Sequence, residues 1–107
     1  MQGVVWSPAE KKVARAAFNA ALARECGAIR HEVEAMLKRS SDPADIWRVH
    51  ECLSEKRREI DQKYDFRYSR LTSVLGRLLA EAWVAEGEIA KLKPEKIAQI
   101  KRSASIW

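Results

Sequence analysis

The stretch IWRVHECLSEKRREIDQKYDFRYS, residues 46–69, decides the fold of this 107-residue chain. It has the pattern of one amphipathic helix, because at about 100° per residue its apolar side chains fall on a single face. That face carries Val49, Leu53, Ile60, Tyr64 and, if the helix continues, Leu71. Most other positions are charged or polar, so the pattern predicts a long helix with one buried side and one solvated side.

Trp47 lies almost opposite this apolar face, on the polar side of the predicted helix. His50 and Glu51 follow it at spacings of three and four, so the three side chains form one contiguous spot, with Arg57 two turns further on at its edge. Two interpretations stay open. Trp47 packs against the first helix or a second copy of the chain, or it is an anchor that docks another protein, a role in which Trp and Arg are enriched.

Two helix starts predict a hairpin. Residues 7–10 (SPAE) combine a capping box with proline at the first helical position, and Asp42-Pro43 repeats the start signal after a short break. We therefore predict helices over residues 7–39 and 43–68. The connection between them is so short that an antiparallel hairpin is expected.

The remainder of the chain, residues 69–107, predicts a small helical head followed by a loose tail. No segment shows the alternation of a strand, so the predicted fold is all-α, a single all-helical domain over residues 1–107. A hairpin with arms about 40 Å long cannot cover its own apolar stripe, since each helix shields only one side of the other. A second copy is the simplest cover, and we predict a homodimer.

The charge distribution argues against a broad nucleic-acid surface. Residues 1–90 hold 15 Lys and Arg against 14 Asp and Glu, whereas residues 91–107 hold five against one. The body is thus nearly neutral, and a basic tail is more often a solvated end than a binding patch. The basic run Lys56-Arg57-Arg58 is interleaved with acids, and Glu59 and Lys63 have the spacing of a helical ion pair. We interpret this run as a solvated helix face.

Catalytic and metal-binding patterns are weak. Cys26 and Cys52 form no CxxC motif, His50 and Cys52 point to different sides of a helix, and His31 lacks the second ligand of an HExxH site. We expect no enzyme activity, no metal and no cofactor. No apolar run reaches the roughly 18 residues of a membrane span, and the first residues lack the apolar pattern of a signal peptide. The expected protein is therefore cytoplasmic, with reduced thiols and no membrane contact.

One block of the chain closely resembles a known family. It is similar to the cyanobacterial fluorescence recovery protein family over residues 47–69, with weaker similarity covering most of the chain. The residues that carry the resemblance follow the pattern W-x-x-HE-x-LS-x-KR-x-EID-x-KYD-x-R-x-S. A match of this density over such a length is specific, unlike a short motif.

This resemblance implies a non-enzymatic, all-helical homodimer that binds the orange carotenoid protein, mainly at its C-terminal domain. Members of the family speed the return of that protein from its active red state to its resting orange state. They also favour its release from the phycobilisome, which ends photoprotective quenching. The Trp, His, Asp and Arg that are implicated in family members correspond here to Trp47, His50, Glu51 and Arg57.

The chain departs from the family pattern at three positions. The family's Asp is Glu51 here, one methylene longer, and the functional Phe and Lys of the family's head correspond to Ser73 and Gln99. Two other functions are weighed beside the leading one. The first is a divergent dimeric scaffold or chaperone-like adaptor for another protein, and the second is a small basic nucleic-acid-binding protein that uses residues 91–107.

Overall fold

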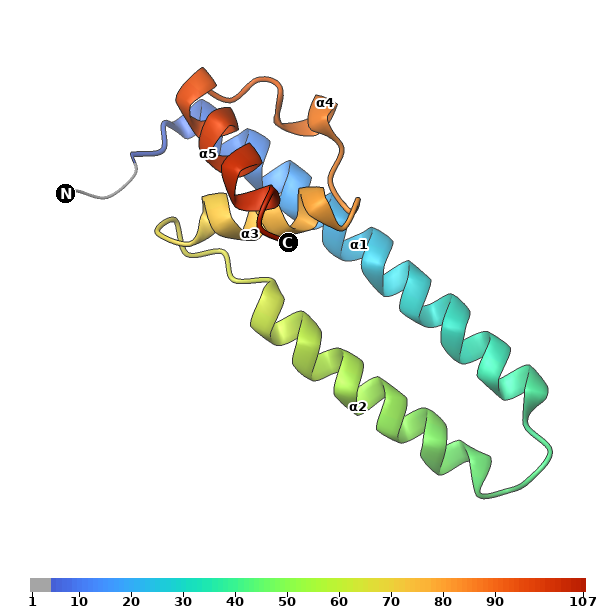
Figure 1. The fold of residues 1–107 in the computed structure, drawn as a ribbon. Coiled ribbons are helices and arrows are strands. Elements are labelled where there is room, and N and C mark those ends of the chain that lie inside the picture. Colours follow the sequence, from blue (N-terminus) through green and yellow to red (C-terminus); the bar gives the residue numbers. More distant parts are fainter. Residues whose placement is uncertain (1–4) are drawn as a thin grey trace.

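The protein is an elongated helical molecule. A computed structural model describes residues 5–107, and no strand occurs in that range. The helices are α1 (Pro8–Arg39), α2 (Asp45–Lys63), α3 (Leu71–Ala80), α4 (Glu86–Ile89) and α5 (Pro94–Ala104). α1 and α2 form an antiparallel hairpin, and α3, α4 and α5 gather as a head at its open end (Figure 1). The predicted all-α fold, with a long hairpin and a small helical head, is confirmed.

α1 begins with the capping box that its sequence predicts. The Ser7 hydroxyl accepts a hydrogen bond from the Glu10 N–H, and the Glu10 carboxylate accepts one from the Ser7 N–H, both at 3.2 Å. Pro8 occupies the first helical position, where its missing N–H leaves no bond unmade. The helix runs for 32 residues, which corresponds to about 48 Å.

α2 begins two residues later than predicted. The Asp45 carboxylate accepts hydrogen bonds from the Ser41 and Asp42 N–H groups, both at 3.2 Å, and the Asp42 carboxylate accepts one from the Ala44 N–H at 2.8 Å. These bonds close a turn that contains Pro43 before the helix starts. Asp42 thus caps the connecting turn and not the helix, which corrects the start signal read from the sequence.

The prediction that the second helix continues to residue 68 is wrong, because α2 ends at Lys63. Tyr64 has the non-helical angles φ −91° and ψ 73°. It and Phe66 turn edge-on to Phe18 of α1, with ring centroids 5.3 and 4.8 Å away. The Asp65 carboxylate also accepts a hydrogen bond from the Arg67 N–H at 3.1 Å. Aromatic packing and this local turn outweigh helix continuation, so Tyr64 and Leu71 do not extend the apolar face of α2.

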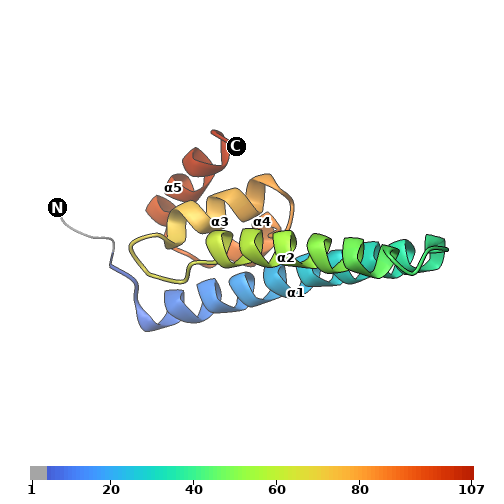
Figure 2. The ribbon, with the colours of Figure 1, turned by 90° about the horizontal axis from the view of Figure 1, so that it is seen from below.

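The hydrophobic core lies at the open end of the hairpin, between the first half of α1 and the head. All buried residues of α1 fall between Glu10 and Ala21. Beyond the head, the hairpin continues as two helices that pack only on each other (Figure 2). The molecule accordingly measures 55 × 26 × 25 Å. The core consists of Trp6, Ala14, Ala17, Phe18, Ala21, Leu71, Val74, Leu75, Leu78, Val84, Ile89, Leu92 and Ile100.

A very close helix crossing and a tight turn shape the head. A Cβ atom added at Gly76 would come within 2.5 Å of the Ser103 Cβ, so α3 and α5 touch there with no room for a side chain. α3 then ends in a Schellman motif, in which the Trp83 N–H bonds to the Leu78 carbonyl and the Ala82 N–H to the Leu79 carbonyl. Ala82 adopts the left-handed conformation of this motif, with φ 65°.

Candidate protein-binding site

Trp47 lies in the first turn of α2, near the tip of the hairpin, and its residue surface is 67% exposed. The His50 ring stands edge-on to the indole, with centroids 6.5 Å apart and an interplanar angle of 77°. Glu51 is exposed beside them. Within one copy of the chain, the three predicted neighbours therefore share a solvent-facing position, and Trp47 does not pack against α1.

Arg57 lies further along α2 and is paired within its own helix. Its Nε is 3.2 Å from the Asp61 carboxylate, and both side chains are mostly exposed. An exposed helical pair of this kind contributes little to stability, roughly 0.3–0.5 kcal/mol. The Arg57 guanidinium could therefore leave Asp61 and bind a different carboxylate at little cost in stability. It makes no hydrogen bond to Trp47 or His50.

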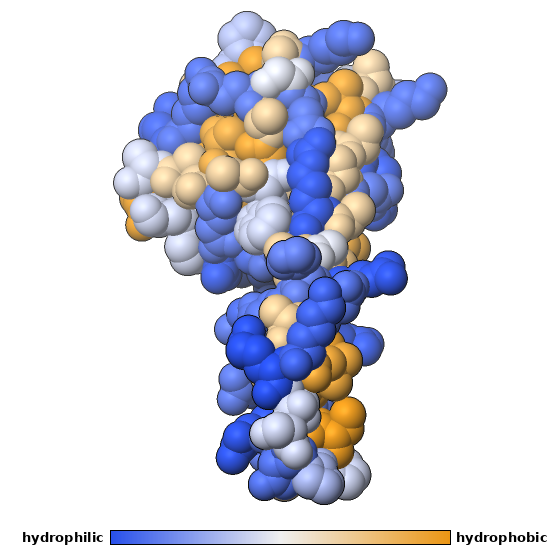
Figure 3. Space-filling model, turned by 90° about the vertical axis from the view of Figure 1, so that its right-hand side faces the viewer, coloured by the Kyte–Doolittle hydropathy of each residue, from blue (hydrophilic) through white to orange (hydrophobic). Residues whose placement is uncertain are grey.

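Three aliphatic side chains of the hairpin are exposed in addition to the residues that the sequence indicated. Leu37, Ile46 and Leu53 are 46%, 51% and 42% exposed. An apolar strip follows one edge of the hairpin in the space-filling view (Figure 3). We use the name distal hairpin surface for the exposed apolar side chains of this part of the hairpin, which are Leu37, Ile46, Trp47 and Leu53. The apolar pattern predicts a buried Leu53, but α1 buries only Val49 among the apolar residues of α2.

The thiols and histidines show no reactive arrangement. The Cys52 thiol donates a hydrogen bond to Glu32 at 3.5 Å, and burial together with the Glu32 carboxylate raises the thiol pKa. It therefore stays protonated and is a poor nucleophile. Cys26 is exposed and unbonded to Cys52. Among residues 5–107, no three His, Cys, Asp or Glu side chains lie close enough together to hold a metal ion.

The basic end of the chain is partly engaged inside the protein. Lys96 is buried and pairs with Glu10 at 2.9 Å, and Lys101 pairs with Glu86 at 2.8 Å. Both cations lie on α5, the helix that runs from Pro94 to Ala104. Two of its cations are thus committed to internal pairs, which leaves less charge for a nucleic-acid phosphate backbone. In the part of the chain that the structure describes, no helix is long and apolar enough to cross a membrane.

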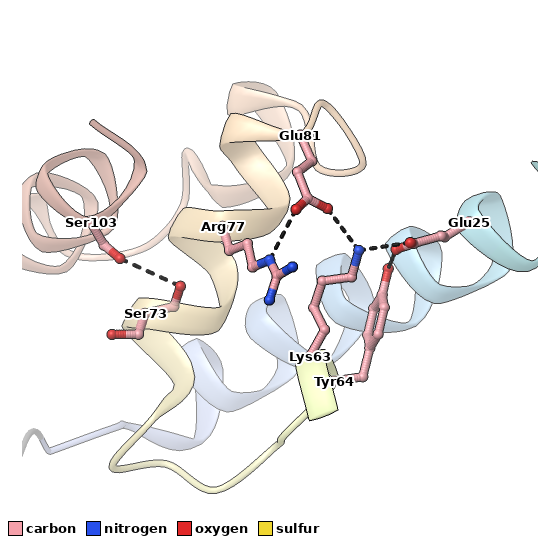
Figure 4. Close-up of polar contacts among 7 residues, drawn as sticks. All are labelled: Glu25, Lys63, Tyr64, Ser73, Arg77, Glu81 and Ser103. Atoms are coloured by element: carbon pink, nitrogen blue, oxygen red, sulfur yellow. Dashed lines mark hydrogen bonds and ion pairs between the residues drawn. The ribbon is translucent and has the colours of Figure 1, made fainter. Parts of the chain in front are cut away.

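The structure also places the two head positions at which the chain departs from the family pattern. Ser73 is exposed on α3, and its backbone carbonyl accepts a hydrogen bond from the Ser103 hydroxyl at 3.4 Å (Figure 4). Gln99 is half-buried on α5. Neither position presents an aromatic ring or a cation, so any contact made by this head uses other side chains.

A helical hairpin that exposes a tryptophan and several aliphatic side chains, and carries a helical head, has the features of a scaffold for contacts between proteins. Comparison with known proteins identifies the family to which this chain belongs. The family model for the photoprotection regulator fluorescence recovery protein matches residues 6–104. This chain belongs to the fluorescence recovery protein family, and it is accordingly a photoprotection regulator.

Individual relatives agree over nearly the whole chain. The fluorescence recovery protein of Synechocystis sp. is 38% identical over 101 residues, which cover 94% of this chain and 93% of the relative. Its solved structure superposes with a TM-score of 0.87, covering 94% of this chain and 99% of that one. The Fremyella diplosiphon fluorescence recovery protein gives a TM-score of 0.86 at 39% identity, with the same coverage.

Proposed function

We propose that this protein binds an orange carotenoid protein, mainly at its C-terminal domain, and accelerates its red-to-orange relaxation. Quenching at the phycobilisome ends as a result. Family membership over residues 6–104 supports this proposal. The observation that carries it is the exposure of Trp47, at 67%, on the face where the resemblance places the family's active residues. Residues 1–107 would act as one domain in the cytoplasm.

The proposed mechanism uses binding energy alone and needs no catalytic group. A binding protein shifts an equilibrium only by its differential affinity for the two states. To speed relaxation, it must also bind the barrier state more tightly than the red state. The apolar distal hairpin surface can provide such a difference in affinity. It binds most tightly the partner conformation that exposes a matching apolar face.

Within this surface, we assign Trp47 as the anchor, with His50 and Glu51 as its polar neighbours. The His50 ring stands beside the indole and carries a donor and an acceptor to the same place. Glu51 keeps the negative charge of the family's Asp on a longer side chain. Arg57, held only by an exposed pair with Asp61, would complete the contact by binding a carboxylate on the partner.

We further propose that the protein is a homodimer formed along the hairpin. Beyond Ala21 no residue of α1 is buried, and Leu37, Ile46 and Leu53 remain 42–51% exposed. A second copy would cover part of this strip. Light scattering at micromolar concentration is expected to give the mass of two chains, and the mass of one chain would contradict the dimer.

Complex formation is tested directly on a sizing column. The protein is mixed with orange carotenoid protein in its red and orange states, and co-elution is followed by carotenoid absorbance. We expect a complex, with at least one of the two states retained. If neither state co-elutes, the proposed partner is wrong, and the adaptor for another protein becomes the leading function.

A further inference from the structure

The side chain of Lys63, the last residue of α2, is buried where the hairpin meets the head. It is only 5% exposed, and its Nζ lies 2.7 Å from Glu25 of α1 and 2.7 Å from Glu81 at the end of α3. Figure 4 shows this ammonium between the two carboxylates. The sequence pattern predicts that Lys63 pairs with Glu59 on a solvated face, and that prediction is wrong. One side chain therefore ties both hairpin helices to the head.

Each carboxylate oxygen of this cluster has a partner. The Tyr64 hydroxyl donates to the second oxygen of Glu25 at 2.8 Å, and Arg77 Nε donates to the second oxygen of Glu81 at 2.9 Å. Burial and the neighbouring Glu25 raise the pKa of Tyr64, so its hydroxyl remains a donor. Two cations balance two carboxylates, and a buried group arranged in this way specifies one geometry.

A second ionic contact begins at the adjacent residue of α1. Arg24 makes a two-pronged pair with Glu88 of α4, at 2.6 and 2.9 Å, and also donates to the Trp83 carbonyl at 2.9 Å. The segment 81–88 is thus held at Glu81 by Lys63 of α2 and at Glu88 by Arg24 of α1. We call the five charged residues that link the hairpin to the head the head clamp: Arg24, Glu25, Lys63, Glu81 and Glu88.

The clamped segment contains the unfavourable backbone of Ala82. An alanine at φ 65° costs about 1 kcal/mol or more relative to the right-handed region. The turn is therefore held in place by its surroundings and not by its own preference. Around it, the head is joined to α2 mainly through residues 64–70, a connection without helical structure. The hydrophobic core joins the head to the first half of α1, and the ionic contacts add directional bonds from the head to α2 and to the middle of α1.

We propose that Lys63 is a positioning residue, which holds the head at one orientation so that a partner contacts the head and the distal hairpin surface together. This inference rests on the proposed function. Lys63 is too buried to touch the partner itself. An apolar residue would fill its volume, but only a cation bonds to both carboxylates and so selects a single head position.

The test uses the full chain and a variant that leaves no carboxylate without a partner. In Lys63→Met with Glu25→Gln, Glu81 keeps Arg77, and the new amide oxygen still accepts from Tyr64. Arg30→Met with Glu34→Gln is the matched control, because it makes the same charge changes in an exposed pair on α1. Glu81→Gln is the second variant, since it removes the head-side carboxylate charge at a partly exposed site and leaves one acceptor oxygen where Lys63 and Arg77 used two.

Hydrogen exchange and recovery kinetics are measured on each variant. We expect amide exchange over residues 81–92 to speed up by about tenfold, with α5 unchanged, because the segment opens locally. If the head is correctly oriented about a tenth of the time, the half-saturating concentration for recovery of photoconverted orange carotenoid protein rises about tenfold. The maximal rate stays unchanged, because saturating partner selects the competent orientation.

Three results would overturn the inference. Unchanged exchange in both variants would show that Lys63 and Glu81 do not fix the head. Faster exchange with an unchanged half-saturating concentration would show that the partner does not sense head orientation. An equal loss in the matched control would show that losing any ion pair of the hairpin has this effect, and that the Lys63 cluster is not special. The exchange measurement needs no partner, so failure of the wild-type chain to act on the carotenoid protein would count against the proposed function alone.

Discussion

Ala82 is the residue whose backbone conformation least suits its side chain. It occupies the position of the Schellman motif where glycine is usual, at φ 65°. We predict that Ala82→Gly raises the free energy of unfolding by up to about 1 kcal/mol. The cost of holding an alanine in the left-handed conformation exceeds the extra conformational entropy that a glycine gives to the unfolded chain. Urea denaturation measures the change. The control is Ala80→Gly within α3, which should destabilise, and a loss of stability in Ala82→Gly itself would contradict the assigned strain.

Trp47→Ala separates the two roles that a tryptophan at this position can have. The side chain is largely exposed in one copy of the chain, so helicity and dimer mass should be retained. Partner binding is predicted to weaken by about 2 kcal/mol or more, as for an interface anchor. Isothermal titration measures the affinity.

The opposite pattern would identify Trp47 as an interface residue between copies. In that case Trp47→Ala would shift the protein towards monomer and cost several kcal/mol of stability, without a direct loss of partner affinity. The sequence alone leaves both roles open, because it shows only that Trp47 lies away from the apolar face. The structure excludes packing of Trp47 against α1, and the variant distinguishes the two roles that remain.

Sequence reasoning is most successful where local chemistry dominates. The capping box at Ser7 and Glu10 places the start of α1 within one residue. It fails at Lys63. Glu59 lies four residues earlier on the same helix, but the ammonium binds the carboxylates of Glu25 and Glu81, which are distant in sequence. Nothing in local spacing reports such a contact, because it depends on how the head folds back onto the hairpin.

At the scale of elements, the α3–α5 crossing depends on a missing side chain. A Cβ at Gly76 would lie 2.5 Å from Ser103 Cβ and 2.9 Å from the Ile100 carbonyl. Gly76→Ala is therefore predicted to force the helices apart and to cost about 1–3 kcal/mol. Gly27→Ala is the contrasting variant: no atom lies within 4 Å of its Cβ, so a gain of about 0.5–1 kcal/mol is expected. Thermal denaturation of both would refute this account if the two shifts had the same sign.

The buried contact between α1 and α5 predicts a pH dependence. Burial raises the pKa of Glu10, but hydrogen bonds from Lys96, Ser7 and Lys93 outweigh it, and the pKa falls from 4.5 to about 2. A carboxyl whose pKa is lower in the folded state than in the unfolded state stabilises the folded protein at pH values above its unfolded-state pKa. This stabilisation is lost as the pH falls through the folded-state pKa. Stability is thus predicted to decline between pH 4.5 and about 2.

Glu10→Gln provides the measurement for that prediction. Urea midpoints across the same pH range should fall less steeply in the variant than in wild type, because the titrating group is gone. Glu34→Gln, at an exposed ion pair on α1, serves as the control and should follow wild type. Equal slopes for Glu10→Gln and wild type would show that this carboxylate does not couple α1 to α5.

The helix ends illustrate what a sequence pattern leaves out. The apolar stripe of α2 continues in phase through Tyr64 and Leu71, which favours a longer helix. The chain leaves the helix after Lys63 because Tyr64 and Phe66 gain aromatic contacts with Phe18, far away in sequence. Tertiary packing decides such boundaries, so periodicity locates the element but not its end.

At the scale of the whole molecule, the division between head and hairpin is predictable from sequence and its geometry is not. The short connection at residues 40–44 indicates antiparallel helices, and the apolar segments after residue 70 indicate a head. The relative position of the two depends on contacts such as those of the head clamp. The distal hairpin surface is likewise only partly visible in sequence, because nothing in the pattern shows that Leu37 and Ile46 remain exposed.

The central claim is that this protein accelerates the relaxation of an orange carotenoid protein, and recovery kinetics test it most directly. Photoconverted carotenoid protein is mixed with this protein in the dark, and the return of the orange spectrum is followed with time. The account predicts a recovery rate that rises with protein concentration and saturates, and that drops for Trp47→Ala at subsaturating concentration. A recovery rate unchanged at every concentration of the wild-type protein would contradict it.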